Sequence, residues 1–264
     1  KYFKSSTESS IEIDRQISDL TDTAYVLCAK QNIFLPFNTN EQNLVIRAGQ
    51  KAKNARAQFS EDHRLARKSN CSSCDREVNS TSGNVTVGNN ETVCIKGSFT
   101  GGVTLNDRAT LKICGNVSLS YINLNGDRDV LIEVGSAGRL SASNLNINEK
   151  VSVINYGRIE LASSLNLNGT AVNHGEWICS GGLNLNNKAS LENFVGATLS
   201  FGGSANVNKD LINAGSINVS GNLQLNNGSN VENYCSITVS GNIAVNDGIY
   251  NGSYIKATGT STFN

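Results

Sequence analysis

The stretch GNLQLNNGSNVENYCSITVSGN, residues 221–242, decides the fold of this chain. It contains three short segments, LQLN (223–226), VEN (231–233) and ITV (237–239), in which apolar residues are spaced to lie on one side of an extended chain. Apolar residues at every second position are typical of a β-strand that buries one face. The Gly-Asn pair that ends the stretch also begins it, so we interpret the stretch as one unit of a repeat.

The apolar-x-apolar-Asn motif is the clearest sign of this repeat. It occurs as VTLN (103–106), INLN (122–125), LNIN (145–148), LNLN (165–168), LNLN (183–186), ANVN (205–208), LQLN (223–226) and IAVN (243–246). The final Asn of one motif lies 18 to 23 residues from the next. Such a regular period indicates stacked structural units rather than a globular domain.

A second column of Asn residues lies between these motifs, each two positions after an apolar residue. Its members are Asn155, Asn173, Asn193, Asn213, Asn233 and Asn251. Apolar residues follow four and six positions later, for example Ile217 and Val219 after Asn213. One repeat therefore predicts three short strands separated by corners, each with only two or three buried side chains.

These features together predict an all-β chain, a parallel β-helix with about 18 to 23 residues per coil. A short strand is unstable alone, but stacked coils form a continuous core. A leucine-rich repeat has a similar period, but it would need an apolar helix or 3₁₀ segment in each repeat, and the sequence offers none.

Composition agrees with an elongated fold. Only 38% of the 264 residues are hydrophobic, which is lean for a compact globule of this length. The formal net charge is zero, so charge gives no reason to expect nucleic acid as a partner. No apolar run approaches the roughly 20 residues that a membrane helix needs, so we expect no membrane span.

The two ends of the chain differ from its repeats. The sequence has no Met, so we expect a processed piece whose signal peptide has been removed. Residues 1–82 lack the repeat, and we predict a small N-terminal cap or linker that covers the strand edges of the first coil. For residues 83–264 we predict the β-helix. The final STFN (261–264) matches the first strand motif again, so we expect the native protein to continue past Asn264.

The repeat resembles those of secreted β-helical surface proteins, namely filamentous-haemagglutinin-like adhesins and the large exported repeat proteins of Bacteroidota. Their apolar-x-Asn-x-Gly-x-Ile-x-Val pattern matches LINAGSINV (211–219), and the resemblance covers roughly residues 83–264. This chain departs from it at Val195, Cys235 and Ser253, where Gly is usual. The resemblance implies an extracellular structural or adhesive protein of a bacterial cell surface or secreted fibre.

The first Asn column suggests two uses. Candidate ligand-binding residues are the Asn at the outward centre of each strand and the Asn that ends it: Asn146, Asn148, Asn166, Asn168, Asn184, Asn186, Asn206 and Asn208. Identical amides at strand spacing can hydrogen-bond along the rod as a purely structural ladder. Alternatively, a flat array of amides recognises a regular partner such as a polysaccharide. For the second column, from Asn155 to Asn251, we predict only a structural ladder.

An aromatic file immediately follows the second column. Its members are Tyr156, His174, Phe194 and Tyr234. Exposed rings at these positions would stack on sugar rings. The alternative is that the rings stack on one another between coils at a corner.

Seven cysteines allow several pairings. For CSSC (71–74) we predict a structural disulfide within the cap. Cys94 and Cys114 lie 20 residues apart, so a disulfide between neighbouring coils is reasonable, but their staggered positions in the repeat argue against it. Cys179 occupies an inward column, whereas Cys235 replaces a corner Gly and is expected to be exposed.

Catalytic residues are not evident. The residues that follow the first Asn column carry mixed charges, such as Asp107, Glu149 and Lys209, and lie on distant coils. The only histidines, His63 and His174, have no evident Ser or Cys partner. We therefore expect no catalysis, no metal and no cofactor.

Two other functions stay open: a carbohydrate-binding or polysaccharide-degrading β-helix, and the cargo of a protein secretion system. The expected partners are polysaccharides, cell-surface components, export machinery, or further copies joined through the β-helix ends.

Overall fold

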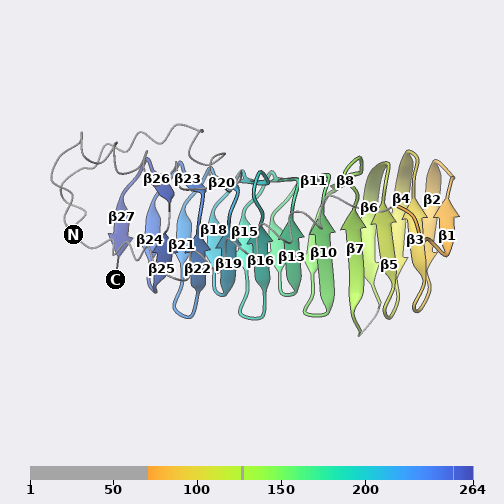
Figure 1. Cartoon of the computed structure of the whole chain (residues 1–264), viewed down its shortest axis with the longest axis horizontal. Coiled ribbons are helices and arrows are strands. Elements are labelled where there is room, and N and C mark those ends of the chain that lie inside the picture. Colours follow the sequence, from red (N-terminus) through yellow and green to blue (C-terminus); the bar gives the residue numbers. More distant parts are fainter. Residues whose placement is uncertain (1–70, 126–127, 252, 264) are drawn as a thin grey trace, which may run out of the picture. The chain divides into compact units, whose positions relative to one another are not determined.

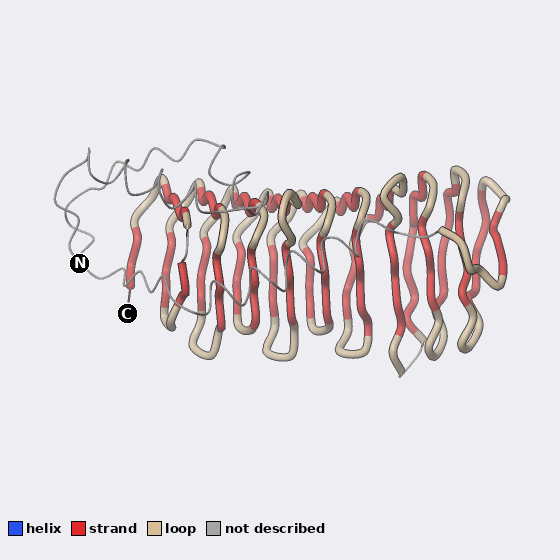
Figure 2. Tube along the Cα trace, viewed as in Figure 1, coloured by secondary structure: helices blue, strands red, loops and turns tan. Residues whose placement is uncertain are grey.

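The computed structural model describes residues 71–125, 128–251 and 253–263. The chain divides into two compact units, Lys1–Ile46 and Arg47–Asn264, and all the described residues belong to the second. They form 27 strands and no helix, stacked one coil upon the next (Figures 1 and 2). The predicted all-β fold is confirmed for this part of the chain. None of the described residues belongs to a helix long and apolar enough to cross a membrane.

The strands form three parallel sheets, which we call A, B and C. Sheet A contains β1 (Arg76–Val78), β3 (Thr92–Ile95), β5 (Thr110–Ile113), β7 (Val130–Val134), β10 (Val151–Asn155), β13 (Thr170–Asn173), β16 (Ser190–Asn193), β19 (Asp210–Asn213), β22 (Asn230–Asn233) and β25 (Ile249–Asn251). Sheet B contains β2 (Ser82–Val87), β4 (Phe99–Leu105), β6 (Asn116–Leu124), β8 (Arg139–Ala142), β11 (Arg158–Leu161), β14 (Glu176–Cys179), β17 (Thr198–Phe201), β20 (Ser216–Val219), β23 (Ser236–Val239) and β26 (Tyr254–Ala257). Sheet C contains β9 (Leu145–Ile147), β12 (Leu165–Leu167), β15 (Leu183–Leu185), β18 (Ala205–Val207), β21 (Leu223–Leu225), β24 (Ile243–Val245) and β27 (Ser261–Phe263).

Each strand pairs with the equivalent strand of the next coil, which is the pairing of a parallel β-helix. The register matches the sequence columns: Asn155 pairs with Asn173, and Leu165 pairs with Leu183. Side chains of one column therefore lie above one another, about 4.8 Å apart. The predicted β-solenoid is confirmed, and its sheets A and B each have ten strands.

The first three coils contain two strands each rather than the predicted three, because sheet C begins only at β9. The motifs VTLN and INLN lie in or at the end of the long strands β4 and β6 of sheet B. In β4, Gly101 and Gly102 remain in the strand, and a Cβ on Gly101 would lie 1.7 Å from the Gly83 carbonyl oxygen. A Gly-Gly pair suits this close approach of two strands as well as it suits a corner, so the sequence pattern does not distinguish them.

The solenoid also begins earlier than predicted. β1 pairs with β3, so the stack includes residues from Arg76 onward rather than from residue 83. Residues 1–70 lie outside the described residues, and the N-terminal cap stays a prediction.

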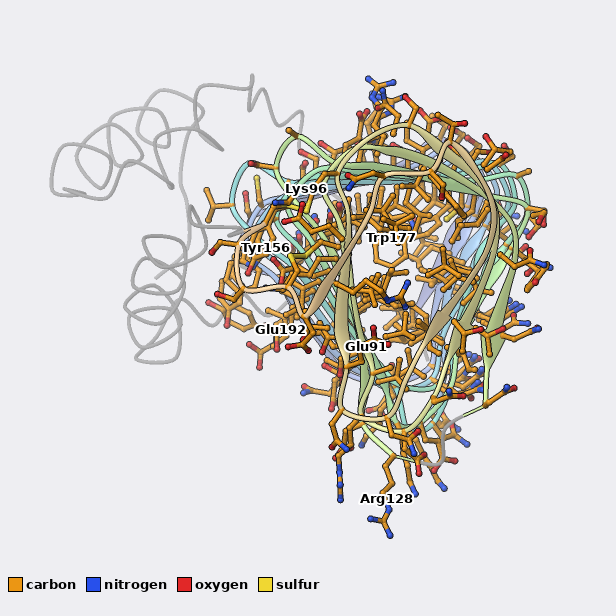
Figure 3. The ribbon with its side chains drawn as sticks, turned by 90° about the vertical axis from the view of Figure 1, so that its right-hand side faces the viewer. Glu91, Lys96, Arg128, Tyr156, Trp177 and Glu192 are labelled. Carbon is orange, nitrogen blue, oxygen red and sulfur yellow. A yellow bond between two sulfur atoms is a disulfide. The ribbon has the colours of Figure 1, made fainter. Side chains whose placement is uncertain are left out.

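The core runs inside the coils as columns of Val, Leu and Ile that alternate with outward polar residues. Most of these inward side chains are fully buried, and Trp177, Phe99 and Phe201 are the largest of them. The view along the stack shows Trp177 inside the coil and Arg128 pointing away from it (Figure 3). The inward side chains are therefore closed to contact with other molecules.

Candidate functional site

The second Asn column forms a continuous buried ladder at the end of the sheet A strands. Asn155, Asn173, Asn193, Asn213 and Asn233 are each 0% exposed. Each side-chain amide donates to the Oδ1 of the next Asn, and the five successive distances, ending at Asn251, are 2.8, 2.9, 2.8, 2.7 and 2.7 Å. The predicted structural ladder is confirmed.

Asn213 shows how each member is held. Its Nδ2 also donates to the Ser236 carbonyl oxygen at 3.0 Å. Its Oδ1 accepts from the Asn193 amide and from the backbone N–H of Gly215, the latter at 3.2 Å. Asn fits because its amide offers donors and an acceptor at once, and an unsatisfied buried polar group is costly. This ladder is closed to ligands and serves to join the coils.

The first Asn column lies on the outer face of sheet C. Asn166 donates to Asn146 at 3.3 Å, Asn184 to Asn166 at 2.8 Å, and Asn206 to Asn184 at 3.2 Å. Asn146 is exposed and the other three are half-buried. The structural alternative for these amides is therefore confirmed as a hydrogen-bonded ladder. Each amide still presents its remaining donor and acceptor capacity to the solvent.

The Asn residues that end the sheet C strands form a neighbouring file. Asn208 donates to the Leu185 carbonyl oxygen at 2.9 Å and accepts from Asn226 at 2.8 Å. Asn148, Asn168 and Asn186 occupy the equivalent corner positions of earlier coils, directly after β9, β12 and β15. The structure thus brings all eight candidate residues together, as two parallel files of amides on one side of the solenoid.

The aromatic file stacks on itself, as the second alternative predicts. The Tyr156 and His174 rings lie 4.9 Å apart at 7°, and the His174 and Phe194 rings lie 4.0 Å apart at 42°. Phe194 is only 4% exposed, so it presents little surface to a sugar ring. Burial and the nearby Glu133 carboxylate raise the pKa of Tyr156. The aromatic file therefore packs at the corner between sheets A and B, and it offers little surface on which a sugar ring could stack.

Tyr234 stands apart from these three rings. It lies beside Tyr250, with ring centroids 5.4 Å apart, and its hydroxyl donates to a Glu232 oxygen at 2.5 Å. Burial is the main cause that raises the Tyr234 pKa, and the hydrogen bond with Glu232 adds to it. The sequence columns missed Tyr250 because it precedes a ladder Asn, whereas the other rings follow one.

The predicted disulfide partners are wrong, although the four cysteines are the right ones. The disulfides join Cys71 to Cys114 and Cys74 to Cys94, with Cα–Cα distances of 6.0 and 5.7 Å. Cys71 does not pair with Cys74, and Cys94 does not pair with Cys114. CSSC therefore does not close on itself but ties its own segment to two neighbouring coils.

The position of this segment explains the pairing. Cys94 occupies an outward position of β3, and Cys114 directly follows β5, the next strand of sheet A. The Lys112 side chain of β5 donates to the Ser72 carbonyl oxygen at 3.1 Å. Residues 71–74 thus cross the outer face of sheet A, and two cysteines three positions apart meet two adjacent coils.

The other two cysteines of the solenoid differ in their bonding. Cys235 is 5% exposed and disulfide-bonded. The expectation of an exposed thiol there is wrong, because the sulfur is part of a disulfide and the residue is buried. Cys179 is a free thiol, 1% exposed, on the inward column as predicted. Burial raises the pKa of the Cys179 thiol to about 12. A hydrogen bond with Trp177 has a smaller effect and lowers this pKa.

Cys179 will therefore be inert in the folded protein. With a pKa of about 12, almost none of it is thiolate at pH 8, and no reagent reaches it. We expect Cys179 not to react with Ellman's reagent over hours in buffer, and to react after unfolding in guanidinium without reductant. Release of one thiol from the native protein would contradict the burial of this side chain.

Charged side chains on the outer faces form isolated pairs. Arg158 bridges the carboxylates of Glu160 and Glu176 on sheet B. Lys188 pairs with Glu149 at 2.8 Å, and both side chains are more than half exposed. Exposed pairs of this kind contribute about 0–1 kcal/mol. Within the described ranges, no three His, Cys, Asp or Glu side chains are grouped so that they could hold a metal ion.

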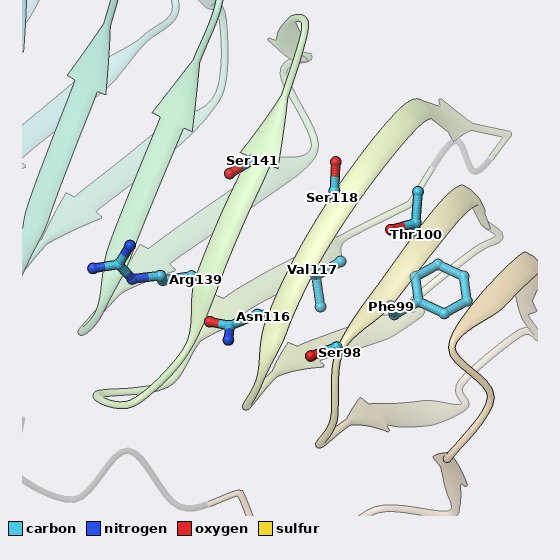
Figure 4. Close-up of a pocket in the computed structure, with 8 residues that line it drawn as sticks. All are labelled: Ser98, Phe99, Thr100, Asn116, Val117, Ser118, Arg139 and Ser141. Atoms are coloured by element: carbon cyan, nitrogen blue, oxygen red, sulfur yellow. The ribbon is translucent and has the colours of Figure 1, made fainter.

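A shallow pocket lies on the outer face of sheet B, over its N-terminal coils. It measures about 470 Å³ and is lined by Ser98, Phe99, Thr100, Asn116, Val117, Ser118, Arg139 and Ser141 (Figure 4). Register places Thr100, Ser118 and Ser141 in one row, with Asn116 beside Arg139. Hydroxyls, an amide and a guanidinium suit a hydroxylated or anionic ligand.

The lining of this pocket contains no Asp or Glu. Glycoside hydrolases need two carboxyl groups about 5 to 10 Å apart. The pocket therefore lacks the groups that this chemistry requires, although it has the groups for simple binding.

A scan against protein-family models, a search of curated proteins and a search of solved structures each found no match. Function is therefore inferred from the residues of this chain. The sequence columns of Asn did not predict this pocket, because they do not include the outward Ser and Thr residues of the sheet B strands. The period-two spacing of these residues is visible in the sequence.

Proposed function

We propose that this chain is a structural or adhesive β-solenoid of a bacterial cell surface or of a secreted fibre, without catalytic activity. The observation that carries the proposal is the buried Asn ladder, which joins successive coils from β10 to β25 without interruption. Because the repeated Asn residues of this ladder bond each coil to the next, the repeat suits a rigid spacer better than a site of catalysis.

Two further observations support an extracellular place. The disulfides Cys71–Cys114 and Cys74–Cys94 tie a segment to the solenoid, and disulfides persist in oxidising compartments. The outer faces of sheets B and C carry mainly Asn, Ser and Thr with scattered ion pairs, which suits a surface in contact with solvent and polysaccharide.

Surface labelling of intact cells tests this proposal. Cells that produce the protein are treated with a membrane-impermeant amine reagent, and labelling is compared with that of a cytosolic protein in the same cells. We expect labelling of this protein in intact cells, with the cytosolic protein labelled only after lysis. Labelling of both proteins only after lysis would overturn the extracellular assignment.

Carbohydrate binding is the second candidate function, and the two amide files on sheet C favour it. A row of half-exposed amides repeating every 4.8 Å or so offers regular donors and acceptors to a repeating sugar chain. The same amides also hydrogen-bond to one another between coils, so the same residues would both hold the coils together and bind the sugar chain.

Replacing Asn166, Asn184 and Asn206 together by Ala tests this function. If sheet C binds polysaccharide, the affinity for any ligand found in a polysaccharide panel will fall at least tenfold, about 1.4 kcal/mol, because three contacts are lost. The matched control replaces the in-register sheet B file Ser200, Asn218 and Thr238 by Ala and should leave binding unchanged. Equal binding by both triple variants, with unchanged melting temperatures, would assign the amides to architecture alone.

A further inference from the structure

The pocket on sheet B is built from two rows of polar side chains that run across three successive coils. The first row consists of Ser98, Asn116 and Arg139, and the second row of Thr100, Ser118 and Ser141 (Figure 4). The rows are two residues apart along each strand, about 7 Å, and the coils are about 4.8 Å apart. The pocket therefore offers a grid of polar groups that is wider than one small anion needs.

The polar side chains of this pocket are not engaged by the rest of the solenoid. None of the six donates or accepts a side-chain hydrogen bond with another described residue. The amides of sheet C differ, because Asn184 both donates to Asn166 and accepts from Asn206. The pocket lining thus keeps its full donor and acceptor capacity for a ligand. Its volume of about 470 Å³ also falls in the range of small-molecule sites, roughly 300–1,000 Å³.

Arg139 gives the pocket a positive charge. Its side chain is exposed and forms no ion pair with any described residue, and the lining holds no carboxylate. The next coil places Arg158 in register with it, but Arg158 already bridges the carboxylates of Glu160 and Glu176. A guanidinium binds a carboxylate through two parallel N–H donors. The first row therefore suits the carboxylate of a ligand.

The second row leads to an exposed aromatic ring. Tyr121 lies two register steps beyond Ser118 on β6, opposite Gly102 of β4, and it is 39% exposed. A Cβ on Gly102 would lie 2.0 Å from the Tyr121 Cζ, so the ring lies over this glycine on the outer face. Tyrosine presents an apolar ring and a hydroxyl together. A sugar likewise has an apolar C–H face and a rim of hydroxyls, and the hydroxyls of the second row can bond to that rim.

We propose that this pocket binds a short chain of uronic acids, with one carboxylate on Arg139, sugar hydroxyls on the second row and a neighbouring sugar against Tyr121. From the Arg139 row to Tyr121 there are four register steps, about 13 Å, so the ligand is a chain rather than a single sugar. The proposal rests neither on the extracellular assignment nor on the amide files of sheet C, so each of the three can fail alone.

Calorimetric titration of the full chain tests the ligand class. The probes are tetramers of galacturonic, glucuronic and mannuronic acid. We expect at least one of them to bind with a Kd below about 1 mM. Its fully methyl-esterified form, which is neutral, and sodium acetate should each bind about tenfold more weakly or worse, because one lacks the carboxylates and the other lacks the sugar.

Three results of this titration would overturn the proposal. The first is that none of the three acids binds. The second is equal binding of the methyl ester, since the carboxylates would then contribute nothing. The third is equal binding of acetate, since the pocket would then be a site for simple anions.

Variants of the pocket test the residues. Arg139→Gln should weaken binding of the tetramer by about tenfold or more, because a charge-assisted pair of hydrogen bonds is lost, and Arg139→Lys should recover part of the loss. Tyr121→Leu should weaken binding by about threefold. The matched control is Lys256→Gln, which removes one positive charge from an exposed position of the same sheet and should change the affinity by less than about twofold. All these side chains are exposed, so the melting temperatures should stay nearly unchanged.

The same variants separate this site from the other surfaces of the solenoid. Equal affinity of Arg139→Gln and the unmodified chain, or an equal loss in Lys256→Gln, would overturn the proposal. The variant with Ala at positions 166, 184 and 206 should bind the tetramer as the unmodified chain does. If that variant loses binding and Arg139→Gln does not, the sugar chain lies on sheet C and the pocket is not its site.

Discussion

Replacing Asn213 by Leu will lower the free energy of unfolding by about 3–5 kcal/mol. The substitution removes the acceptor for the Asn193 amide and the Gly215 N–H, and the donor for Asn233 and the Ser236 carbonyl. Each buried group left without a partner costs about 1–3 kcal/mol, and Leu recovers only part of this through its apolar surface. Guanidinium unfolding followed by far-ultraviolet circular dichroism measures the change.

The matched control is Asn206→Ala on the outer face of sheet C. Asn206 donates to Asn184 at 3.2 Å, as Asn213 donates to Asn233, but it is half exposed and water replaces the lost bond. We expect a change within about 0.5 kcal/mol. A similar loss in both variants would show that burial does not distinguish the two ladders.

Replacing Trp177 by Ala will lower the free energy of unfolding by about 3–5 kcal/mol, the usual cost of truncating a buried aromatic side chain. Trp177 is 0% exposed and lies between Ile159 and Leu199 of the adjacent coils. The narrow interior has no further layer of side chains that could move into the cavity. The midpoint of unfolding by circular dichroism gives the loss.

Trp177→Phe keeps most of the ring volume and should cost clearly less than Trp177→Ala. Because Trp177 is the only Trp, fluorescence of the unmodified chain reports its environment. Its emission should be blue-shifted in the folded state and shift to the red on unfolding. Emission of the native protein at the wavelength of exposed Trp would contradict the burial.

Much of the architecture could be predicted because parallel coils stack in register. Residues at the same place in successive repeats then lie above one another, so a column in the sequence becomes a column in space. Asn155 and Asn173 show this for the buried ladder, and Asn166 and Asn184 show it for the outer one. The self-stacking of Tyr156 and His174 follows from the same rule, although their ring angle depends on the corner geometry.

The sequence by itself therefore determined the coils, the two ladders and the inward place of Cys179, because these depend on local alternation and on the repeat period. The tertiary structure alone decided the rest. It placed residues 71–74 across sheet A, and so gave Cys71 and Cys74 partners on two different coils. It kept Gly101 and Gly102 inside a strand, and it gave the first three coils two strands rather than three. These outcomes depend on where a segment without a repeat meets the stack and on how closely two backbones approach, and neither is encoded in a periodic column.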